Sequence, residues 1–367
     1  MHANVLRVGS LAVLLAGCRP GPPPEGVDTG RFEEPAIEWA PETYVAYRAS
    51  DPPRIDGRLD DLAWETADWT ADFVDIRGVA NPEPRLRTRA KMTWDDEFFY
   101  VAAELEEPDL WATLTERDAV IYRDNDFEMF IDPDGDTHEY YELEINALGT
   151  VWDLFLVKPY RDGGPALHGW DIRGLQTAVH LSGTLNRPGD RDDGWSIEIA
   201  LPWTALREAA HKDAPPHLDD QWRVNFSRVQ WRLDVRRGRY AKRTDGEGEP
   251  LSEDNWVWSP QGLVNMHYPE MWGIVQFAGE RRLRDERIEP DSQARARWIL
   301  RQVYYREKAF HARHGRYSDD PTELGLTADR LAGIPWPLRI TATPRWFEAL
   351  FIRLGDTLTI SADGRLR

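Results

Sequence analysis

Apolar and polar residues alternate with a period of two in many short segments, and this pattern constrains the fold most. Residues 88–94 (TRAKMTW) place Ala90, Met92 and Trp94 on one side, and residues 99–105 return after an acidic turn, which predicts a hairpin. The alternation recurs in residues 126–132, 140–146, 151–157, 195–201, 222–231 and 272–277. Helical patterns are few, at residues 59–67 and 202–210. The sequence therefore predicts a mainly β fold, an antiparallel, jelly-roll-like β-sandwich.

The first residues are typical of an export signal. A short apolar stretch, LAVLLAG (11–17), is too brief to span a bilayer and precedes Cys18, the only cysteine of the chain. The segment LLAGC resembles the lipobox of bacterial lipoprotein signals, which implies a signal peptide over residues 1–18 and lipidation of Cys18. The alternative is an ordinary secretory signal with a chance cysteine. We expect residues 19–42, which begin with a proline-rich run, to form an extended tether.

The same resemblance places the protein in a bacterial cell envelope. A lipid on Cys18 would be its membrane anchor. Arg19, in place of an aspartate after the cysteine, favours the outer membrane, on its periplasmic or its exposed side.

The rest of the chain divides in two. Residues 43–279 hold the alternating segments, whereas residues 280–367 begin with an amphipathic helix that ends near Gly315 and continue into a few short strands. We expect a β-sandwich followed by a small C-terminal α+β appendage, which resembles the helix-plus-sheet tail of pilin-like secreted proteins. The appendage either docks on the sandwich or recruits a partner.

Charge excludes one class of partner. The chain carries 45 Lys and Arg against 64 Asp and Glu, a formal net charge of −19. Such an excess of negative charge repels phosphates, so we expect no nucleic-acid binding. The 17 tryptophans, in contrast, have faces that grip flat, weakly polar ligands as well as filling cores.

The most acidic segment is NDFEMFIDPDGD, residues 125–136. Its strand pattern places Glu128 on a sheet face that would also present Glu142, Glu144, Asn146 and Glu198. That face either binds a ligand or is only the solvated side of the sheet. In the following turn Asp132, Asp134 and Asp136 have the spacing that begins a calcium site, although Gly135 does not stand where an EF-hand requires it. The turn predicts either a structural Ca²⁺ or ordinary Asp-Gly turn chemistry.

A series of sequence blocks resembles the family 9 carbohydrate-binding modules, a family related to DOMON-like domains. The blocks are residues 55–64, 91–105, 124–133, 142–154, 194–206, 222–228 and 267–277, in the family's order. The resemblance spans about residues 43–279. It implies a β-sandwich that binds sugars, often at chain ends, by stacking a ring between aromatic side chains, and it implies bound calcium. Many members are attached to xylanases and related glycosidases.

The resemblance also implies site residues. The family's strand glutamate falls on Glu128 and its asparagine on Asn146, its two stacking tryptophans fall on Tyr122 and near Met266, and Glu144 replaces an arginine. Arg228 is a further polar candidate or, equally, an internal partner for one of the acids. The remaining candidates are Trp152, Trp170, Trp256, Trp258, His267 and Trp272. Each of these tryptophans could instead be a core residue.

The function expected is binding without turnover. A membrane-anchored protein would hold polysaccharide or oligosaccharide by aromatic stacking and polar contacts, in support of carbohydrate catabolism and beside a glycoside hydrolase or transporter.

Two alternatives stay open. A glycoside hydrolase would need a carboxylate pair drawn from Glu142, Glu144 and Glu198, and an open sheet face makes the necessary raised pKa hard to arrange. A haem-binding electron-transfer domain would use Met266 and His267 as ligands, although adjacent strand residues point to opposite faces.

Overall fold

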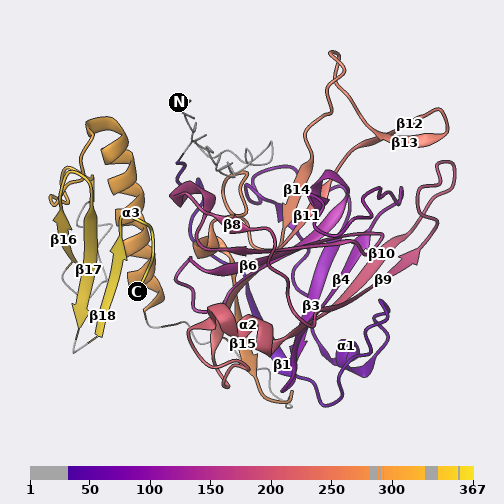
Figure 1. Cartoon of the computed structure of the whole chain (residues 1–367), viewed down its shortest axis with the longest axis horizontal. Coiled ribbons are helices and arrows are strands. Elements are labelled where there is room, and N and C mark those ends of the chain that lie inside the picture. Colours follow the sequence, from indigo (N-terminus) through magenta and orange to yellow (C-terminus); the bar gives the residue numbers. More distant parts are fainter. Residues whose placement is uncertain (1–31, 282–287, 289–290, 292, 327–337, 354–355) are drawn as a thin grey trace, which may run out of the picture.

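The computed structural model describes residues 32–367 apart from 282–287, 289–290, 292, 327–337 and 354–355. Its main body is a 13-stranded sheet in the order β8-β7-β6-β5-β11-β15-β1-β3-β4-β10-β9, with β14 beside β11 and β2 beside β14. The strands are β1 (Thr43–Arg48), β2 (Val74–Asp75), β3 (Thr88–Trp94), β4 (Phe98–Glu106), β5 (Asp126–Asp132), β6 (Tyr140–Asn146), β7 (Val151–Leu156), β8 (Ala166–Leu167), β9 (Gln176–Ser182), β10 (Gly194–Pro202), β11 (Gln221–Gln230), β14 (Asp254–Val257) and β15 (Gly273–Ala278). The sheet curls so that its two halves pack face to face (Figure 1), which confirms the predicted mainly β sandwich.

Strand β1 joins the two halves. It runs parallel to both β15 and β3, whereas the other strand pairs of the described sheet are antiparallel. The hairpin of β12 (Leu233–Arg236) and β13 (Arg239–Lys242) projects from the sandwich at the upper right of Figure 1. Two short helices, α1 (Leu62–Thr66) and α2 (Trp203–Ala210), lie where the sequence predicts helical segments.

The main core lies between the two halves of the sheet, because the strands turn their apolar residues inward. On β5, Phe127, Met129 and Ile131 are buried there, as the alternation predicts. Trp203 packs edge-on against Trp222 in this core, with ring centroids 5.5 Å apart. Part of the high tryptophan content therefore serves the core.

The outer face of β5 and β6 is buried as well, which contradicts the solvated face that their alternation suggests. Every residue of both strands is buried. A second apolar cluster covers this face and includes Ile121, Tyr140, Met266 and Trp272. Its covering segments contain the short 3-10 turns η1 (Ile121–Arg123), η2 (Tyr160–Asp162) and η3 (Pro269–Met271). Polar side chains on this face are consequently enclosed rather than solvated.

The C-terminal appendage has its own core and docks on the sandwich. Helix α3 (Ala294–His314) packs on a three-stranded antiparallel sheet of β16 (Leu338–Ala342), β17 (Phe347–Arg353) and β18 (Asp356–Ser361). The helix ends at Gly315, whose φ of 69° is left-handed, as predicted. Tyr305 donates a hydrogen bond to Glu270, and Arg365 Nε lies 2.6 Å from Asp136 Oδ2. Of the two roles considered for the appendage, docking is the one the structure shows.

Residues 32–42 belong to the folded body, although the sequence assigns them to the tether. Trp39 stacks on Trp298 of α3 with centroids 5.5 Å apart, and Phe32 lies 5.5 Å from Tyr304. Residues 1–31, with the predicted signal, Cys18 and the proline-rich run, lie outside the described residues. Among the helices of the described residues, none is long and apolar enough to cross a bilayer.

Candidate functional site

A cavity of about 190 Å³ opens on the outer face of β5, β6 and β7. Its floor consists of outward-facing residues of these paired strands, because alternation places them on one side; they are Glu128, Phe130, Glu142, Glu144, Trp152 and Leu154. Its walls come from Tyr122 in η1, Tyr160 in η2, residues 264–267 before η3, and Glu253 with Asn255. Segments far apart in the sequence thus meet in one site.

Three carboxyl groups share the floor. Glu128 on β5 lies directly opposite Glu144 on β6, and Glu142 stands two residues earlier on β6. Each is at most 5% exposed. Burial raises the pKa of Glu128 to about 7, and burial together with neighbouring negative charge raises the pKa values of Glu142 and Glu144 well above their usual range. The group therefore retains protons at neutral pH.

Asp126 extends this cluster. Carboxylate oxygens of Asp126, Glu128 and Glu144 lie within 4.8 Å of one another. Asp126 Oδ1 accepts a hydrogen bond from the Val229 N–H at 3.2 Å, but Oδ2 has no partner among the described residues. Glu144 Oε2 accepts the Tyr122 N–H at 2.9 Å. The floor is thus rich in carboxyl groups, incompletely hydrogen-bonded and tied to the loop that carries Tyr122.

Aromatic rings stand beside the carboxyl groups. The rings of Tyr122 and Trp152 have centroids 6.3 Å apart, and Tyr160 meets His267 edge-on at 4.5 Å. Trp152 is 3% exposed, and its Nε1–H has no acceptor within the described part of the chain. Burial and the charge of Arg161 lower the pKa of His267 to about 3, so this imidazole is neutral. Ring faces beside polar atoms suit a ligand that has a C–H face and a hydroxyl edge.

The structure brings half of the predicted site residues together. Tyr122, Glu128, Glu144, Trp152 and His267 all line the cavity, as does the Met266 position.

Asn146 does not line the cavity. It lies at the end of β6, where its Nδ2 donates to Leu114 O at 2.9 Å and to Asp124 Oδ2 at 3.1 Å. It therefore contacts both sides of the loop that carries Tyr122.

Arg228 lies on the opposite face of its strand. Ser227 is the cross-strand partner of Glu128, so Arg228 points into the sandwich instead. Its side chain is 1% exposed and its Nη2 lies 2.8 Å from Glu107 Oε2. Arg228 therefore has an internal role, but its partner is Glu107 and not one of the acids of the candidate face.

Of the other tryptophan candidates, three are core residues and Trp170 is half-buried. Trp256 and Trp258 belong to the main core, whereas Trp272 lies under the cavity and donates its Nε1–H to Met266 O at 2.8 Å. Trp170 packs against Tyr141, whose side chain faces the main core. We therefore leave these four tryptophans out of the candidate site.

Sequence reasoning missed several residues of the cavity. The alternation predicts Glu142 on the same strand face as Glu144. The family resemblance, however, does not name it as a sugar-binding residue. Tyr160 and Glu253 lie in loops, and their approach to the floor depends on how those loops pack.

The turn with the predicted calcium ligands is already well hydrogen-bonded. Asp132 accepts the N–H groups of Gly135 and Thr137, each at 2.9 Å. Asp136 accepts the His138 N–H at 2.7 Å and Arg365 Nε–H at 2.6 Å. These oxygens lie close to those of Asp134, but a divalent ion would compete with an arginine for them. The residues fit calcium poorly, and calcium at this turn stays a prediction.

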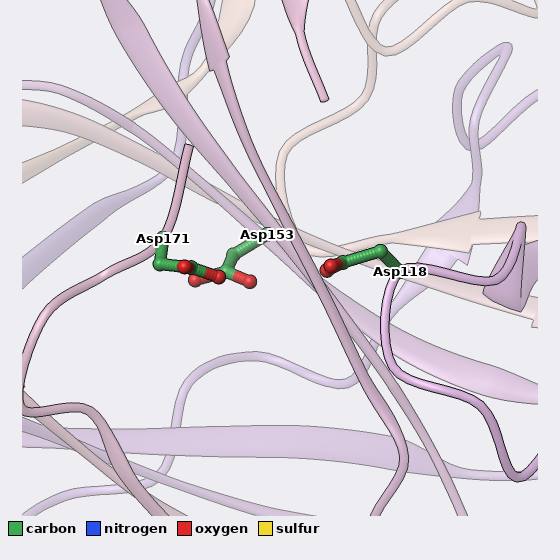
Figure 2. A group of neighbouring side chains, drawn as sticks. All are labelled: Asp118, Asp153 and Asp171. Carbon is green, nitrogen blue, oxygen red and sulfur yellow. The ribbon is translucent and has the colours of Figure 1, made fainter. Parts of the chain in front are cut away.

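A second acidic group, Asp118, Asp153 and Asp171, surrounds an arginine. Figure 2 shows the three carboxylates turned toward one space from both sides. Arg117 forms ion pairs with all three, at 2.9 Å to Asp171 and 3.7 Å to Asp118. The guanidinium supplies the positive charge that this group needs.

The acids considered for hydrolysis do not share one face. Glu198 lies in the other half of the sheet, where it accepts Trp64 Nε1–H and Gly57 N–H, each at 2.6 Å. The prediction that these acids lie on an open sheet face is nevertheless wrong for Glu142 and Glu144. Both are enclosed, and their pKa values are raised.

The appendage holds two walls of the cavity in place. Glu270 of η3, just after the wall segment 264–267, accepts a hydrogen bond from Tyr305 of α3. The same carboxylate lies 2.9 Å from Nη2 of Arg161. Arg161 is the residue after Tyr160, which forms another wall of the cavity. Contacts with α3 therefore fix the loops that carry both walls.

Residues 55–215 match the family described as carbohydrate family 9 binding domain-like. This stretch contains the floor of the cavity with Tyr122 and Tyr160, whereas the walls from residues 253–267 lie beyond it.

Two curated relatives are glycosidases. "Exoglucanase XynX" of Acetivibrio thermocellus is 25% identical over 162 residues, 44% of this chain and 12% of the relative. "Endo-1,4-beta-xylanase A" of Thermoanaerobacterium saccharolyticum is 25% identical over 154 residues, 42% of this chain and 11% of the relative. The match thus spans about an eighth of these much longer proteins.

Among solved structures, a family 9 carbohydrate-binding module of Caldicellulosiruptor kristjanssonii is similar. Its cellotriose complex has a TM-score of 0.43 and 17% identity and covers 68% of this chain and 100% of the module. Its glucose complex has a TM-score of 0.42 and 17% identity and covers 67% and 100%.

Proposed function

We propose, from the premise that residues 55–215 form a carbohydrate family 9 binding domain-like region, that this protein binds carbohydrate without turning it over. The observation that carries the proposal is the cavity above β5, β6 and β7. It combines the rings of Tyr122 and Trp152 with the carboxyl groups of Glu128 and Glu144, and all four lie within the matched region.

The geometry suits a single sugar ring. Its C–H face would lie against Tyr122 or Trp152 and gain dispersion contact, while its hydroxyls donate to Glu128 and Glu144. A hydroxyl oxygen would accept the free Trp152 Nε1–H. The cavity is smaller than the roughly 300 Å³ at which pockets for drug-sized ligands begin, so one ring enters and the rest of an oligosaccharide lies outside.

A glycan array followed by calorimetric titration of the full chain tests this function. Tyr122→Ala and Glu128→Gln should each weaken binding about tenfold or more, since each removes one contact of the ring. Two matched controls should leave the affinity unchanged. Trp346→Ala alters an exposed aromatic residue of the appendage, and Glu307→Gln alters a buried carboxyl in α3 whose pKa is also raised to about 7. No glycan bound by the folded chain, or equal losses in controls and test variants, would contradict the proposal.

We further propose that a lipid on Cys18 anchors the protein in the cell envelope, favouring the outer membrane. There it would hold polysaccharide or oligosaccharide for a neighbouring glycoside hydrolase or transporter, in support of carbohydrate catabolism. Incorporation of labelled fatty acid into the chain, its loss in Cys18→Ser, and membrane fractionation test the anchor. Label retained in the variant would contradict it.

Hydrolysis of O-glycosyl bonds is a second candidate, favoured by the enclosed carboxyl pair of Glu128 and Glu144. Their oxygens lie within 4.8 Å, slightly closer than the separation of roughly 5–5.5 Å between carboxyls in retaining glycosidases. Prolonged incubation with oligosaccharides tests it. Products released by the parent chain but not by Glu128→Gln or Glu144→Gln would establish hydrolysis, and no products at all would exclude it.

A further inference from the structure

We propose that the sugar bound in this cavity carries a positive charge, as an amino sugar with a free amine does. This inference rests on the proposed function, because it names the class of sugar that the same cavity takes. It follows from the charge of the lining, from polar atoms that lack partners, and from the position of the aromatic rings.

The lining of the cavity has acidic residues as its only charged side chains among the described residues, since His267 is neutral. It contains Glu128, Glu142, Glu144 and Glu253 but no Lys or Arg. The guanidinium of Arg161, next to a wall residue, is paired with Glu270 instead. Burial raises the pKa values of Glu128, Glu142 and Glu144, so these carboxyl groups hold protons in the empty cavity. A cationic ligand compensates their negative charge when they ionise and is electrostatically complementary to the site, whereas a neutral sugar supplies no such charge.

Buried polar atoms without partners indicate what this ligand offers. Glu142 lines the cavity, and its buried Oε2 has no hydrogen-bond partner among the described residues. Asp126 Oδ2 lacks a partner too, but Asp126 lies beside Glu128 and Glu144 without lining the cavity itself. An ammonium group has three donors and no acceptor, and its hydrogen bonds to carboxylates are roughly twice as strong as neutral ones. Trp152 Nε1–H, by contrast, is a buried donor without an acceptor, which a sugar hydroxyl oxygen would satisfy.

The aromatic walls favour an organic cation over a metal ion. A bare divalent ion would engage the oxygens of Asp126, Glu128 and Glu144, but it would leave the Trp152 Nε1–H without an acceptor. An amino sugar fills both parts of the site. Its ring contacts the aromatic side chains. Its ammonium group is attracted both by the carboxylates and by the π-electrons of the aromatic rings.

Calorimetric titration of the full chain with three trisaccharides of the same linkage tests the proposal. One trisaccharide consists of glucosamine units, one of N-acetylglucosamine units and one of glucose units. At pH 6 only the glucosamine trisaccharide is charged, and low salt keeps its charge from being screened. We expect the glucosamine trisaccharide to bind about tenfold or more tightly than either neutral one. Glu144→Gln should remove most of that preference, because it lowers the affinity for the glucosamine trisaccharide about tenfold more than the affinity for the glucose trisaccharide. Glu307→Gln, the buried control carboxyl in α3, should change neither affinity, and an unreduced melting temperature of Glu144→Gln shows that the variant is folded.

The outcomes separate this inference from the proposed function. If the glucose trisaccharide binds as tightly as the glucosamine one, the amino-sugar proposal is overturned while carbohydrate binding stands. If no trisaccharide binds and a glycan array is also negative, both are overturned. If calcium or magnesium alone binds, depends on Glu144 and displaces the glucosamine trisaccharide, the cavity is a metal site and the amino-sugar proposal is wrong.

Discussion

Glu128 and Glu144 face each other across β5 and β6 as direct cross-strand partners, and both are buried. Like charges in this position destabilise a sheet, and removal from water makes their ionisation more costly still. The pair is therefore tolerated because it holds protons. Its ionisation at higher pH should lower the stability of the folded protein.

The first prediction concerns pH. The pKa of Glu128 is near 4.5 when unfolded and about 7 when folded, so the folded state binds more protons between these values. The free energy of unfolding should fall as pH rises through this window, and Asp126, Glu142 and Glu144 act in the same direction. Glu128→Gln should recover on the order of 2–3 kcal/mol at pH 8 and little at pH 4.5. Denaturant unfolding at several pH values checks this, and an equal slope in both proteins would contradict it.

The second prediction concerns the ion pairs under the appendage. Although burial opposes it, the charges of Arg161 and Arg301 lower the pKa of Glu270 to about 2. Glu270→Gln would remove the carboxylate that these two buried guanidinium groups share and should cost about 3–5 kcal/mol. Ligand binding should weaken as well, because Tyr160 adjoins Arg161. Chemical unfolding and titration of the variant measure both effects.

A surface pair gives the matched control for that experiment. Arg316 and Glu323 form an exposed ion pair at 3.1 Å in the same appendage. Glu323→Gln should change stability by less than about 0.5 kcal/mol. Similar losses in Glu323→Gln and Glu270→Gln would mean that the buried network has no special role.

The third prediction separates the two roles considered for Arg228. Arg228→Met leaves the Glu107 carboxylate buried without its partner, so we expect a loss of about 3–5 kcal/mol in unfolding free energy. The folded fraction should bind carbohydrate with unchanged affinity, because Arg228 lies on the far face of β11. If Arg228→Met is stable but has lost its affinity for carbohydrate, Arg228 takes part in binding and the prediction is wrong.

The fourth prediction concerns Arg365 and the turn of Asp132, Asp134 and Asp136. In the parent chain the guanidinium of Arg365 is paired with Asp136, where a calcium ion would otherwise bind. Neither calcium nor a chelator should therefore change the melting temperature. In Arg365→Ala the turn loses this charge, and we expect a lower melting temperature that added calcium partly restores. Calcium stabilisation of the parent chain, reversed by chelator, would instead support the predicted metal site.

The sequence was most informative where a local pattern is sufficient. Alternation over residues 88–94, 126–132 and 140–146 predicted β3, β5 and β6 with their observed bounds. Gly315 likewise ends α3, because its left-handed conformation suits glycine. Alternation also placed Glu128 and Glu144 on outward faces of their strands, but both appeared among the predicted site residues because of the resemblance to the carbohydrate-binding modules.

Tertiary structure decided what covers each face. An alternating strand specifies two faces, but it does not say whether the second one meets water, and here loops from residues 114–123, 160–166 and 257–272 bury it. This burial raises the pKa of Glu128 and brings Tyr160 and Glu253 to the cavity. Side-chain alternation depends only on neighbouring residues, whereas desolvation and charge pairing depend on chain segments that are distant in sequence.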